Sequence, residues 1–309
     1  MIVGSVRSGL VEGLHPVAAV AVDADGDVVA EIGSDLDRPF FFRSAVKPFQ
    51  AFVSQAAGAD LGAEQLAVAS ASHSGQPVHI AYVRAMLDGV GLDPSALRCP
   101  PDRPIAEAAA CRLGLTPPEP IFHNCSGKHS GMLRACVANG WSLDYTPPDH
   151  PLQQQVASFV SELTGAPVDP VGVDGCGIPT LRGDVRGLAR AFARLAVDDE
   201  LAEVAAATRR FASLTSDGDR REARLARWFP GSVKGGAMGC IGLAWREGGL
   251  GFAAKSWTGA SAPAGVAVVE LMQHLGVLPA HPRTMLESVA RPAVFGGGRS
   301  VGSLQPLPT

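Results

Sequence analysis

Serine and lysine stand three residues apart in the segment Arg43-Ser44-Ala45-Val46-Lys47-Pro48. On a helix these two side chains share one face, close enough for the Ser44 hydroxyl and the Lys47 amine to meet. A neutral lysine accepts the serine proton, and the resulting nucleophile attacks a carbonyl carbon. Burial and a nearby cation such as Arg43 lower the lysine pKa, as this chemistry requires. The alternative is structural: Ser44 caps a helix and Lys47 points to water.

Lysine is scarce in this chain. Of 26 Lys and Arg residues only four are lysine: Lys47, Lys128, Lys234 and Lys255. A coding bias toward arginine and alanine explains the loss of surface lysines. Because guanidinium does not lose its proton, arginine cannot serve where a neutral amine is needed. The four remaining lysines, which lie among Ser, Gly, Pro and Cys, are therefore candidates for chemistry.

Two other kinds of segment carry hydroxyls and amines. An apolar run leads into the segment Ala71-Ser72-His73-Ser74-Gly75. The hydroxyls of this segment would relay protons or bind a substrate. The alternative is an ordinary serine-rich turn that caps the next helix. Lys234 and Lys255 lie beside glycine or serine near the C-terminal hairpin, where each would bring a positive charge to a substrate. The alternative for both is a hairpin lysine exposed to solvent, and the sequence favours this alternative more for Lys255 than for Lys234.

Cysteine and histidine concentrate in two glycine-containing segments. His123-Asn124-Cys125-Ser126-Gly127-Lys128-His129 precedes a predicted helix, and Val173-Asp174-Gly175-Cys176-Gly177 precedes another. Two thiolates with a histidine or a neutral lysine suit a tetrahedral zinc site. The spacing matches no standard zinc finger, and a Cys125–Cys176 disulfide is the competing interpretation.

The elements that must position these residues are strands at the two ends of the chain and helices between them. Apolar runs at 17–22 and 28–32 flank an Asp-Gly turn, and those at 237–245 and 250–257 flank Arg246-Glu247-Gly248-Gly249, so each pair predicts an antiparallel hairpin. Alanine-rich segments of helical length, which we expect to form helices, lie at 44–57, 78–90, 104–113, 128–139, 151–164, 180–196, 199–214 and 263–276. Residues 296–308 are expected to form an edge strand or a loose tail. This pattern predicts an α+β fold: an antiparallel sheet built from N- and C-terminal strands around a central helical block.

Composition limits the class of protein. The 309 residues are 46% hydrophobic and 18% charged with a net charge of -4, which argues against extended disorder and against nucleic acid as the main partner. We expect one domain over residues 1–309, either undivided or made of two closely packed lobes. The start of the chain lacks the apolar core of a signal peptide, and no apolar stretch is long enough to span a membrane, so we expect a cytoplasmic protein. Its six cysteines are then expected to be reduced thiols or metal ligands rather than disulfides.

Five motifs together resemble the asparaginase II family, the rhizobial-type L-asparaginases. They are RSAVKP, ASHSGQ, HNCSGKHSGM, VDGCGIPT and VKGGAMG, in the family's order, and the resemblance spans about residues 10–300. The family is similar in fold to serine β-lactamases and glutaminases, whose sheet is built from both chain ends. The resemblance thus implies the same α+β architecture that the hairpins predict.

The resemblance also implies roles for particular residues. It makes Ser44 the nucleophile and Lys47 its base, with Ser72 and Lys234 as a second Ser–Lys pair. It implies a metal ion, with zinc expected, held by Cys125, Lys128 and Cys176, and it implies a homodimer. The candidate substrate-binding residues are Arg43, Ser74, His129 and Lys255.

Some positions depart from the family's pattern. Gly235 stands where a threonine or serine commonly follows the lysine, Met238 and Thr258 stand where the family usually has carboxylates, and Gln76 replaces a common glutamate. The expected function is hydrolysis of L-asparagine to L-aspartate and ammonia. The departures keep two alternatives open: a related serine amidohydrolase of different amide specificity, and a catalytically weakened metal-binding homologue.

Overall fold

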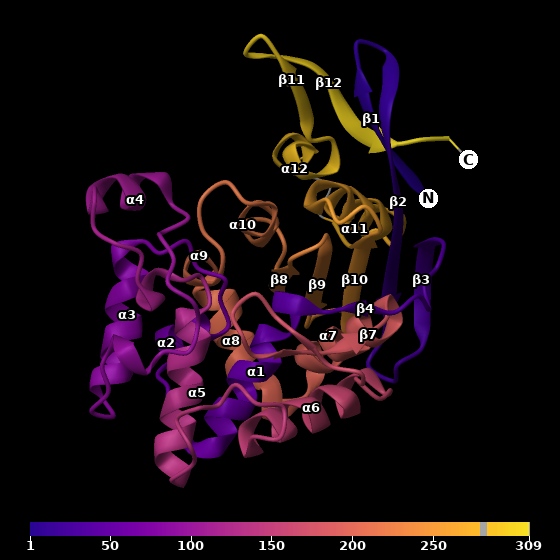
Figure 1. Ribbon diagram of the computed structural model, residues 1–309. Coiled ribbons are helices and arrows are strands. Elements are labelled where there is room, and N and C mark those ends of the chain that lie inside the picture. The colour runs from indigo at the N-terminus through magenta and orange to yellow at the C-terminus, as the bar shows by residue number, and fades with distance from the viewer. Residues whose placement is uncertain (279–282, 309) are drawn as a thin grey trace.

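The computed structural model describes residues 1–278 and 283–308 (Figure 1). The strands are β1 (Ile2–Arg7), β2 (Leu10–Val22), β3 (Val28–Gly33), β4 (Phe40–Phe41), β5 (Gly172–Val173), β6 (Pro179–Thr180), β7 (Arg182–Gly183), β8 (Ser232–Gly236), β9 (Cys240–Trp245), β10 (Leu250–Ser256), β11 (Ala293–Gly296) and β12 (Arg299–Pro306). The α-helices are α1 (Lys47–Ser54), α2 (Ala63–Ala69), α3 (Pro77–Asp88), α4 (Glu107–Leu113), α5 (Ser126–Asn139), α6 (Pro151–Thr164), α7 (Val185–Val197), α8 (Ala202–Arg210), α9 (Ala212–Thr215), α10 (Arg221–Ala226), α11 (Ser261–His274) and α12 (Arg283–Ala290). A 3-10 turn, η1 (Arg43–Val46), leads directly into α1.

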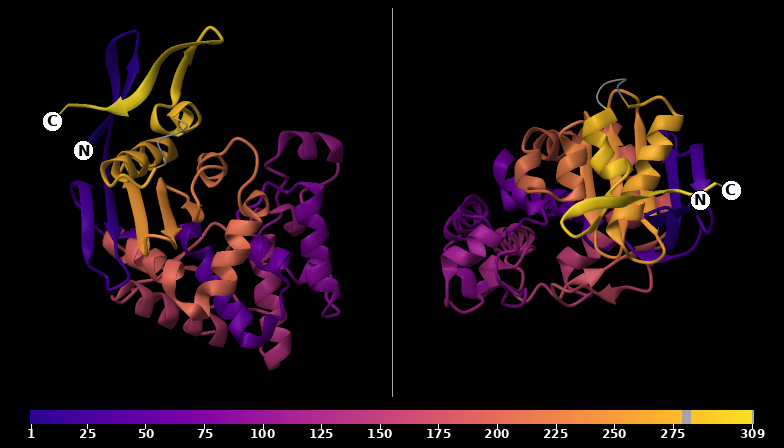
Figure 2. Two further views of the ribbon diagram at one scale, coloured as in Figure 1. Left: turned by 180° about the vertical axis from the view of Figure 1, so that it is seen from behind. Right: turned by 90° about the horizontal axis from the view of Figure 1, so that it is seen from above.

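One antiparallel sheet joins the two ends of the chain. Its order is β11-β12-β1-β2-β10-β9-β8, and β3 also pairs with β2. The long strand β2 makes this possible, because its first half pairs with β1 and its second half pairs with β10 and β3. Both termini lie at the end of the molecule formed by β1 and β12 (Figures 1 and 2). The predicted α+β fold, with a sheet from both chain ends around a helical middle, is confirmed.

Both faces of the sheet are buried in its centre. In the run 17–22, Val17, Ala19 and Ala21 pack into one apolar core, while the alternate residues pack into a second. Because side chains alternate across a strand, an uninterrupted apolar run requires a cover on each side. Helix α11 contacts β2 and β10 on one face, and α7 contacts the same strands on the other.

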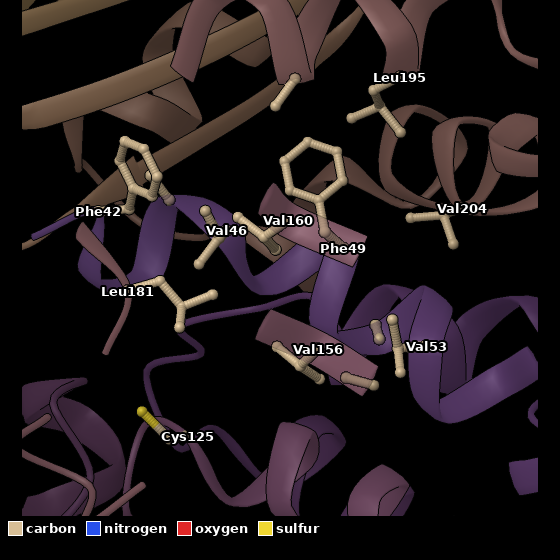
Figure 3. Close-up of a cluster of buried hydrophobic side chains, with 14 of the residues drawn as sticks. Phe42, Val46, Phe49, Val53, Cys125, Val156, Val160, Leu181, Leu195 and Val204 are labelled. Atoms are coloured by element: carbon tan, nitrogen blue, oxygen red, sulfur yellow. The ribbon is translucent and has the colours of Figure 1, made fainter. Parts of the chain in front are cut away.

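The helical block fixes the start of α1. Phe42, Val46 and Phe49 are fully or almost fully buried, and α1 contacts α5, α6 and α8. Figure 3 shows these side chains among Val156, Val160, Leu195 and Val204 from three other helices. The ring of Phe49 also meets Phe192 of α7 edge to face, with centroids 5.4 Å apart. Four elements therefore hold the segment that carries Ser44 and Lys47.

Several boundaries differ from those that the sequence predicts. The strand expected at 237–245 begins at Cys240, because Met238 and Gly239 take positive φ values in the turn before it. This turn joins β9 to β8, a strand that the sequence did not predict. The helix expected at 180–196 begins at Val185, after the short strands β6 and β7. The helix expected at 199–214 ends at Arg210, and α9 follows after the non-helical Phe211.

Other elements were not predicted at all. The apolar run that precedes Ser72 is the short helix α2, and α10, α12 and β1 are also additions. The C-terminal segment expected as an edge strand or tail forms β12, which pairs with β1 and β11 and so lies inside the sheet. Among the described residues, no helix is both long and apolar enough to cross a membrane.

Candidate active site

The hydroxyl of Ser72 lies between two buried amines. Lys47 Nζ donates to Ser72 Oγ at 3.0 Å, and Lys234 Nζ donates to the same oxygen at 3.1 Å. The lysines come from the first turn of α1 and from β8, and Ser72 lies in the loop after α2. Each amine also donates to a backbone carbonyl, Lys47 to Ala71 and Lys234 to Gly235. The fold thus brings three segments of the chain to one hydroxyl group.

Burial lowers the pKa of both lysines. The Lys47 side chain is 0% exposed and Lys234 is 5% exposed. Loss of hydration disfavours the charged form, and each ammonium also lies near other cations. The pKa of Lys234 falls to about 7, first through burial and then through the charge of Lys47. The pKa of Lys47 is lowered as well, again chiefly by burial. Neutral amine is therefore available at Lys234 near neutral pH.

Ser44 opens onto a cavity of about 180 Å³ beside this pair. The cavity is smaller than the ~300–1,000 Å³ clefts that hold drug-sized ligands, so it suits a small molecule. Its lining residues are Ser44, Ser72, Asn124, Thr215, Ser216, Arg220, Glu222, Val233, Lys234, Gly235, Gly236 and Ala237. Within the described chain no hydrogen bond joins Ser44 to Lys47, because the Lys47 amine is directed to Ala71 and Ser72 instead. The lysines of both predicted Ser–Lys pairs therefore contact Ser72, and Ser44 lies on the cavity wall without a hydrogen bond to Lys47 in the described chain.

Two thiols and an amine gather behind the Ser–Lys cluster. Lys128 Nζ lies 3.2 Å from Cys176 Sγ, and the side chains of Cys125, Lys128 and Cys176 are each at most 4% exposed. A hydrogen bond with Cys176, together with the charges of Lys47 and Lys128, holds the pKa of Cys125 well below its usual range. All six cysteines are free thiols, so Cys125 and Cys176 form no disulfide.

His129 completes this cluster. Burial lowers its pKa to about 4. Its Nδ1 pairs with the Tyr145 hydroxyl at 2.7 Å, and its buried Nε2 has no hydrogen-bond partner in the described chain. Within residues 1–278 and 283–308, no group of three or more His, Cys, Asp and Glu side chains is arranged to hold a metal ion. The donor set here is instead two thiols and a lysine amine, beside an unpartnered imidazole nitrogen.

The loops that carry the two clusters are tied together. Arg43 Nε donates to Asp174 Oδ1 at 2.6 Å, which joins the Ser44 segment to the Cys176 loop. Burial alone would raise the pKa of the Asp174 carboxyl, but Lys128 and Arg43 hold it below its ordinary value. Asn124 lines the cavity and accepts a hydrogen bond from Cys125 Sγ at 2.9 Å. The Cys–Lys cluster and the cavity therefore share a wall.

The four candidate substrate-binding residues lie outside the cavity lining. Arg43 is paired with Asp174, Ser74 donates to Asp217, and His129 pairs with Tyr145. The Lys255 amine donates to the carbonyls of Met238 and Ser256 and lies 5.5 and 5.6 Å from the ring centroids of Phe40 and Trp257. None of these four side chains belongs to the described cavity wall.

Residues that were not predicted supply one side of the cavity. They come from one polar segment that runs from the end of α9 to the first turn of α10: Thr215, Ser216, Arg220 and Glu222. Arg220 Nη1 donates to the Ser72 carbonyl at 2.5 Å and Nη2 pairs with Asp217 at 2.7 Å. The signal was present in the sequence, because residues 215–222 read TSDGDRRE between apolar segments. Its position over Ser72 and Lys234 was not visible there.

Comparisons with known proteins give one family and several solved structures. The family model described as L-asparaginase II matches residues 3–306. Among solved structures, Mglu in its glutamate form is 16% identical over 86% of this chain and 62% of that one, with a TM-score of 0.45. A putative beta-lactamase from Bacteroides dorei DSM 17855 is 17% identical over 84% of this chain and 94% of that one, with a TM-score of 0.45. The chain spans less than two thirds of the length of Mglu. No protein among the curated sequences matches it.

Proposed function

The chain belongs to the L-asparaginase II family, and from that premise we propose that it hydrolyses L-asparagine to L-aspartate and ammonia through a serine nucleophile activated by lysine. The observation that carries the proposal is the Ser72 hydroxyl, held between the amines of Lys47 and Lys234 at the wall of a small cavity that also contains Ser44. Buried amines next to hydroxyls are the groups that nucleophilic amide hydrolysis needs.

In the proposed reaction, Ser44 Oγ attacks the side-chain amide carbon and its proton passes to neutral Lys47. Ser72 contacts both amines, so it supports a proton path from Lys47 toward Lys234. The carbon–nitrogen bond then breaks, and the leaving nitrogen takes a proton from this pair and departs as ammonia. Water attacks the acyl-enzyme, aspartate is released, and Ser44 regains its proton.

Backbone amides support the tetrahedral intermediate of this scheme. Ser44 lies in the first turn of η1, where backbone N–H groups have no partner within the helix. We propose that the N–H of Ser44, a residue of the cavity wall, binds the negative charge that develops on the amide oxygen.

The candidate binding residues are proposed to shape the cavity through the loops that they hold. Arg43 does so through Asp174, and Ser74 does so through Asp217, which also pairs with Arg220 of the cavity wall. His129 packs beside Cys176, and Lys255 fixes the turn at Met238. Their proposed effect on substrate is therefore indirect.

Cys125, Lys128 and Cys176 are proposed to hold zinc. Two buried thiols in mutual contact and an amine 3.2 Å from one of them fit three positions of a tetrahedral site, and the unpartnered Nε2 of His129 lies in the same cluster. When bound, zinc would supply a fixed positive charge behind the cavity and hold the loops of Cys125 and Cys176 together. We further propose that the protein is cytoplasmic and forms a homodimer. Light scattering on the purified protein tests the homodimer.

A second candidate function is hydrolysis of a different amide. It is favoured by Gly235, the departure from the family's pattern that lines the cavity, whereas Met238 and Thr258 are not among the lining residues. The test follows ammonia release from L-asparagine, L-glutamine and short amides by the wild-type protein and Ser44→Ala. The proposal expects turnover of asparagine that Ser44→Ala abolishes. Turnover of another amide alone selects the second candidate, and binding without turnover in zinc-loaded protein selects the weakened homologue.

A further inference from the structure

Glu222 reaches the cavity because residue 235 has no side chain. A Cβ atom built on Gly235 would overlap the Glu222 carboxylate and lie 2.8 Å from its Cγ. Gly235 follows Lys234 on β8, and the Glu222 carboxylate of α10 occupies the space that a side chain at position 235 would fill. The glycine and the glutamate form a matched pair on the cavity wall.

Arg221 holds this carboxylate in place from outside the cavity. The Arg221 guanidinium is 8% exposed, pairs with Glu222 Oε1, and donates to the carbonyls of Ser261 and Cys240. Burial raises the pKa of Glu222, but the charge of Arg221 outweighs it and brings the pKa to about 2. Oε2 accepts no hydrogen bond from another residue in the described chain. Glu222 thus gives the cavity wall a fixed negative charge with one oxygen that accepts no hydrogen bond from another described residue.

The charges on the cavity wall match those of a free amino acid. Among the residues that line it, Glu222 is the one carboxylate, and the basic residues are Lys234 and Arg220, whose guanidinium is also paired with Asp217. A free α-amino acid carries an ammonium and a carboxylate on one carbon atom. Charge-assisted hydrogen bonds to both groups would fix its orientation and select it over amides that lack either group.

We propose that Glu222 is the specificity-determining residue that binds the α-ammonium group of the substrate. The inference rests on the proposed function, and it names the residue by which the site would select a free α-amino acid over peptides and simple amides. An alternative role for Glu222 is only to neutralise Arg221 and Lys234. That role would affect ligands with and without an ammonium group alike.

The experiment compares binding of L-aspartate and succinate by calorimetry, since the two dicarboxylates differ only in the ammonium group and neither is turned over. The variants are Glu222→Gln and, as a matched control, Glu247→Gln in the exposed hairpin after β9. Gly235→Ala is the second test, because it displaces the carboxylate without removing its charge. Thermal unfolding of each variant shows whether it is folded.

We expect the wild-type protein and Glu247→Gln to prefer L-aspartate over succinate by about 10- to 100-fold, the range for a hydrogen bond to a charged group. Glu222→Gln and Gly235→Ala should lose this preference, while succinate affinity stays the same or rises because a nearby negative charge is lost or displaced. A preference that persists in folded Glu222→Gln overturns the inference, as does a wild-type protein that shows none or binds neither ligand. Hydrolysis of asparagine is measured separately. An enzyme that hydrolyses asparagine but does not prefer L-aspartate over succinate refutes only the inference about Glu222. A protein that prefers L-aspartate but does not hydrolyse asparagine refutes only the proposed function.

Discussion

The Lys47 amine lies 3.0 Å from the hydroxyl of Ser72 and makes no hydrogen bond to Ser44, although Ser44 is three residues away in the sequence and both residues belong to the described chain. Lys47 therefore contacts the hydroxyl group that also receives Lys234. This arrangement gives the two serines different surroundings: Ser72 is held by two amines, and Ser44 faces the cavity.

The two serines should differ when each is replaced by alanine. Ser44→Ala should lower kcat for amide hydrolysis by at least about 1,000-fold, because the nucleophile is removed. Ser72→Ala should lower it by roughly 100-fold or more through loss of proton transfer, while Ser44 still forms a covalent adduct. Ammonia release and intact-protein mass spectrometry with a reactive amide analogue measure both effects, with Ser213→Ala as the exposed control. An adduct on Ser72 would reverse the assignment.

The pKa of Lys234 sets the pH dependence of activity. Because burial lowers this pKa from 10.5 to about 7, the amine becomes neutral as the pH rises through 7, and kcat/KM should rise through the same range to a plateau. Lys234→Arg keeps its proton at all these pH values and should lose both the ascending limb and most of the activity. A pH–rate profile that keeps an inflection near 7 in the Arg variant would assign that inflection to another group.

Lys234 should also make stability depend on pH in a defined direction. Between pH 7 and 10.5 the folded protein has released the Lys234 proton while the unfolded chain still holds it. The unfolded state binds more protons there, so the free energy of unfolding should increase with pH across this window. Urea unfolding of the wild type and Lys234→Met at several pH values measures the difference in slope. Equal slopes would mean that Lys234 keeps its ordinary pKa.

Zinc content tests the Cys–Lys cluster. The purified protein should contain a stoichiometric amount of zinc, and Cys125→Ala and Cys176→Ala should each lose it, because too few ligands then remain for a closed tetrahedral site. Cys111→Ala is the matched control, since Cys111 is an exposed thiol on α4. Elemental analysis decides the matter. Zinc retained at full stoichiometry in Cys176→Ala would place the metal elsewhere.

Two glycines of α5 should respond in opposite ways to alanine. A Cβ on Gly127 would lie 2.5 Å from the Val68 carbonyl oxygen of α2, whereas one on Gly131 meets only side-chain carbons at 3.4 and 3.5 Å. Gly127→Ala should lower the free energy of unfolding by about 1–3 kcal/mol. Gly131→Ala should be neutral or stabilising by up to ~1 kcal/mol, because alanine favours a helix interior. Chemical denaturation of the two variants measures the contrast, and equal effects would argue against the close contact of α2 with α5.

Local patterns in the sequence were enough to predict several elements of the fold. Turn residues between apolar runs predicted the hairpins β2–β3 and β9–β10, and alanine-rich segments predicted most of the central helices, because turn chemistry and apolar patterning act over a few residues. The scarcity of lysine pointed to Lys47, Lys128 and Lys234, which the structure places within one pair of adjoining clusters.

Which side chains contact one another in the site depends on how distant elements pack. Ser72 lies 25 residues from Lys47 and 162 from Lys234 along the chain, and their contact depends on α1, the loop after α2 and β8 packing on a common core. Glu222 was invisible for the same reason, since its access to the cavity depends on the missing side chain of Gly235 on a neighbouring element. A sequence pattern records the residues that one element presents, whereas the pairing of surfaces between elements fixes distances, burial and pKa values, and these select the chemistry of the site.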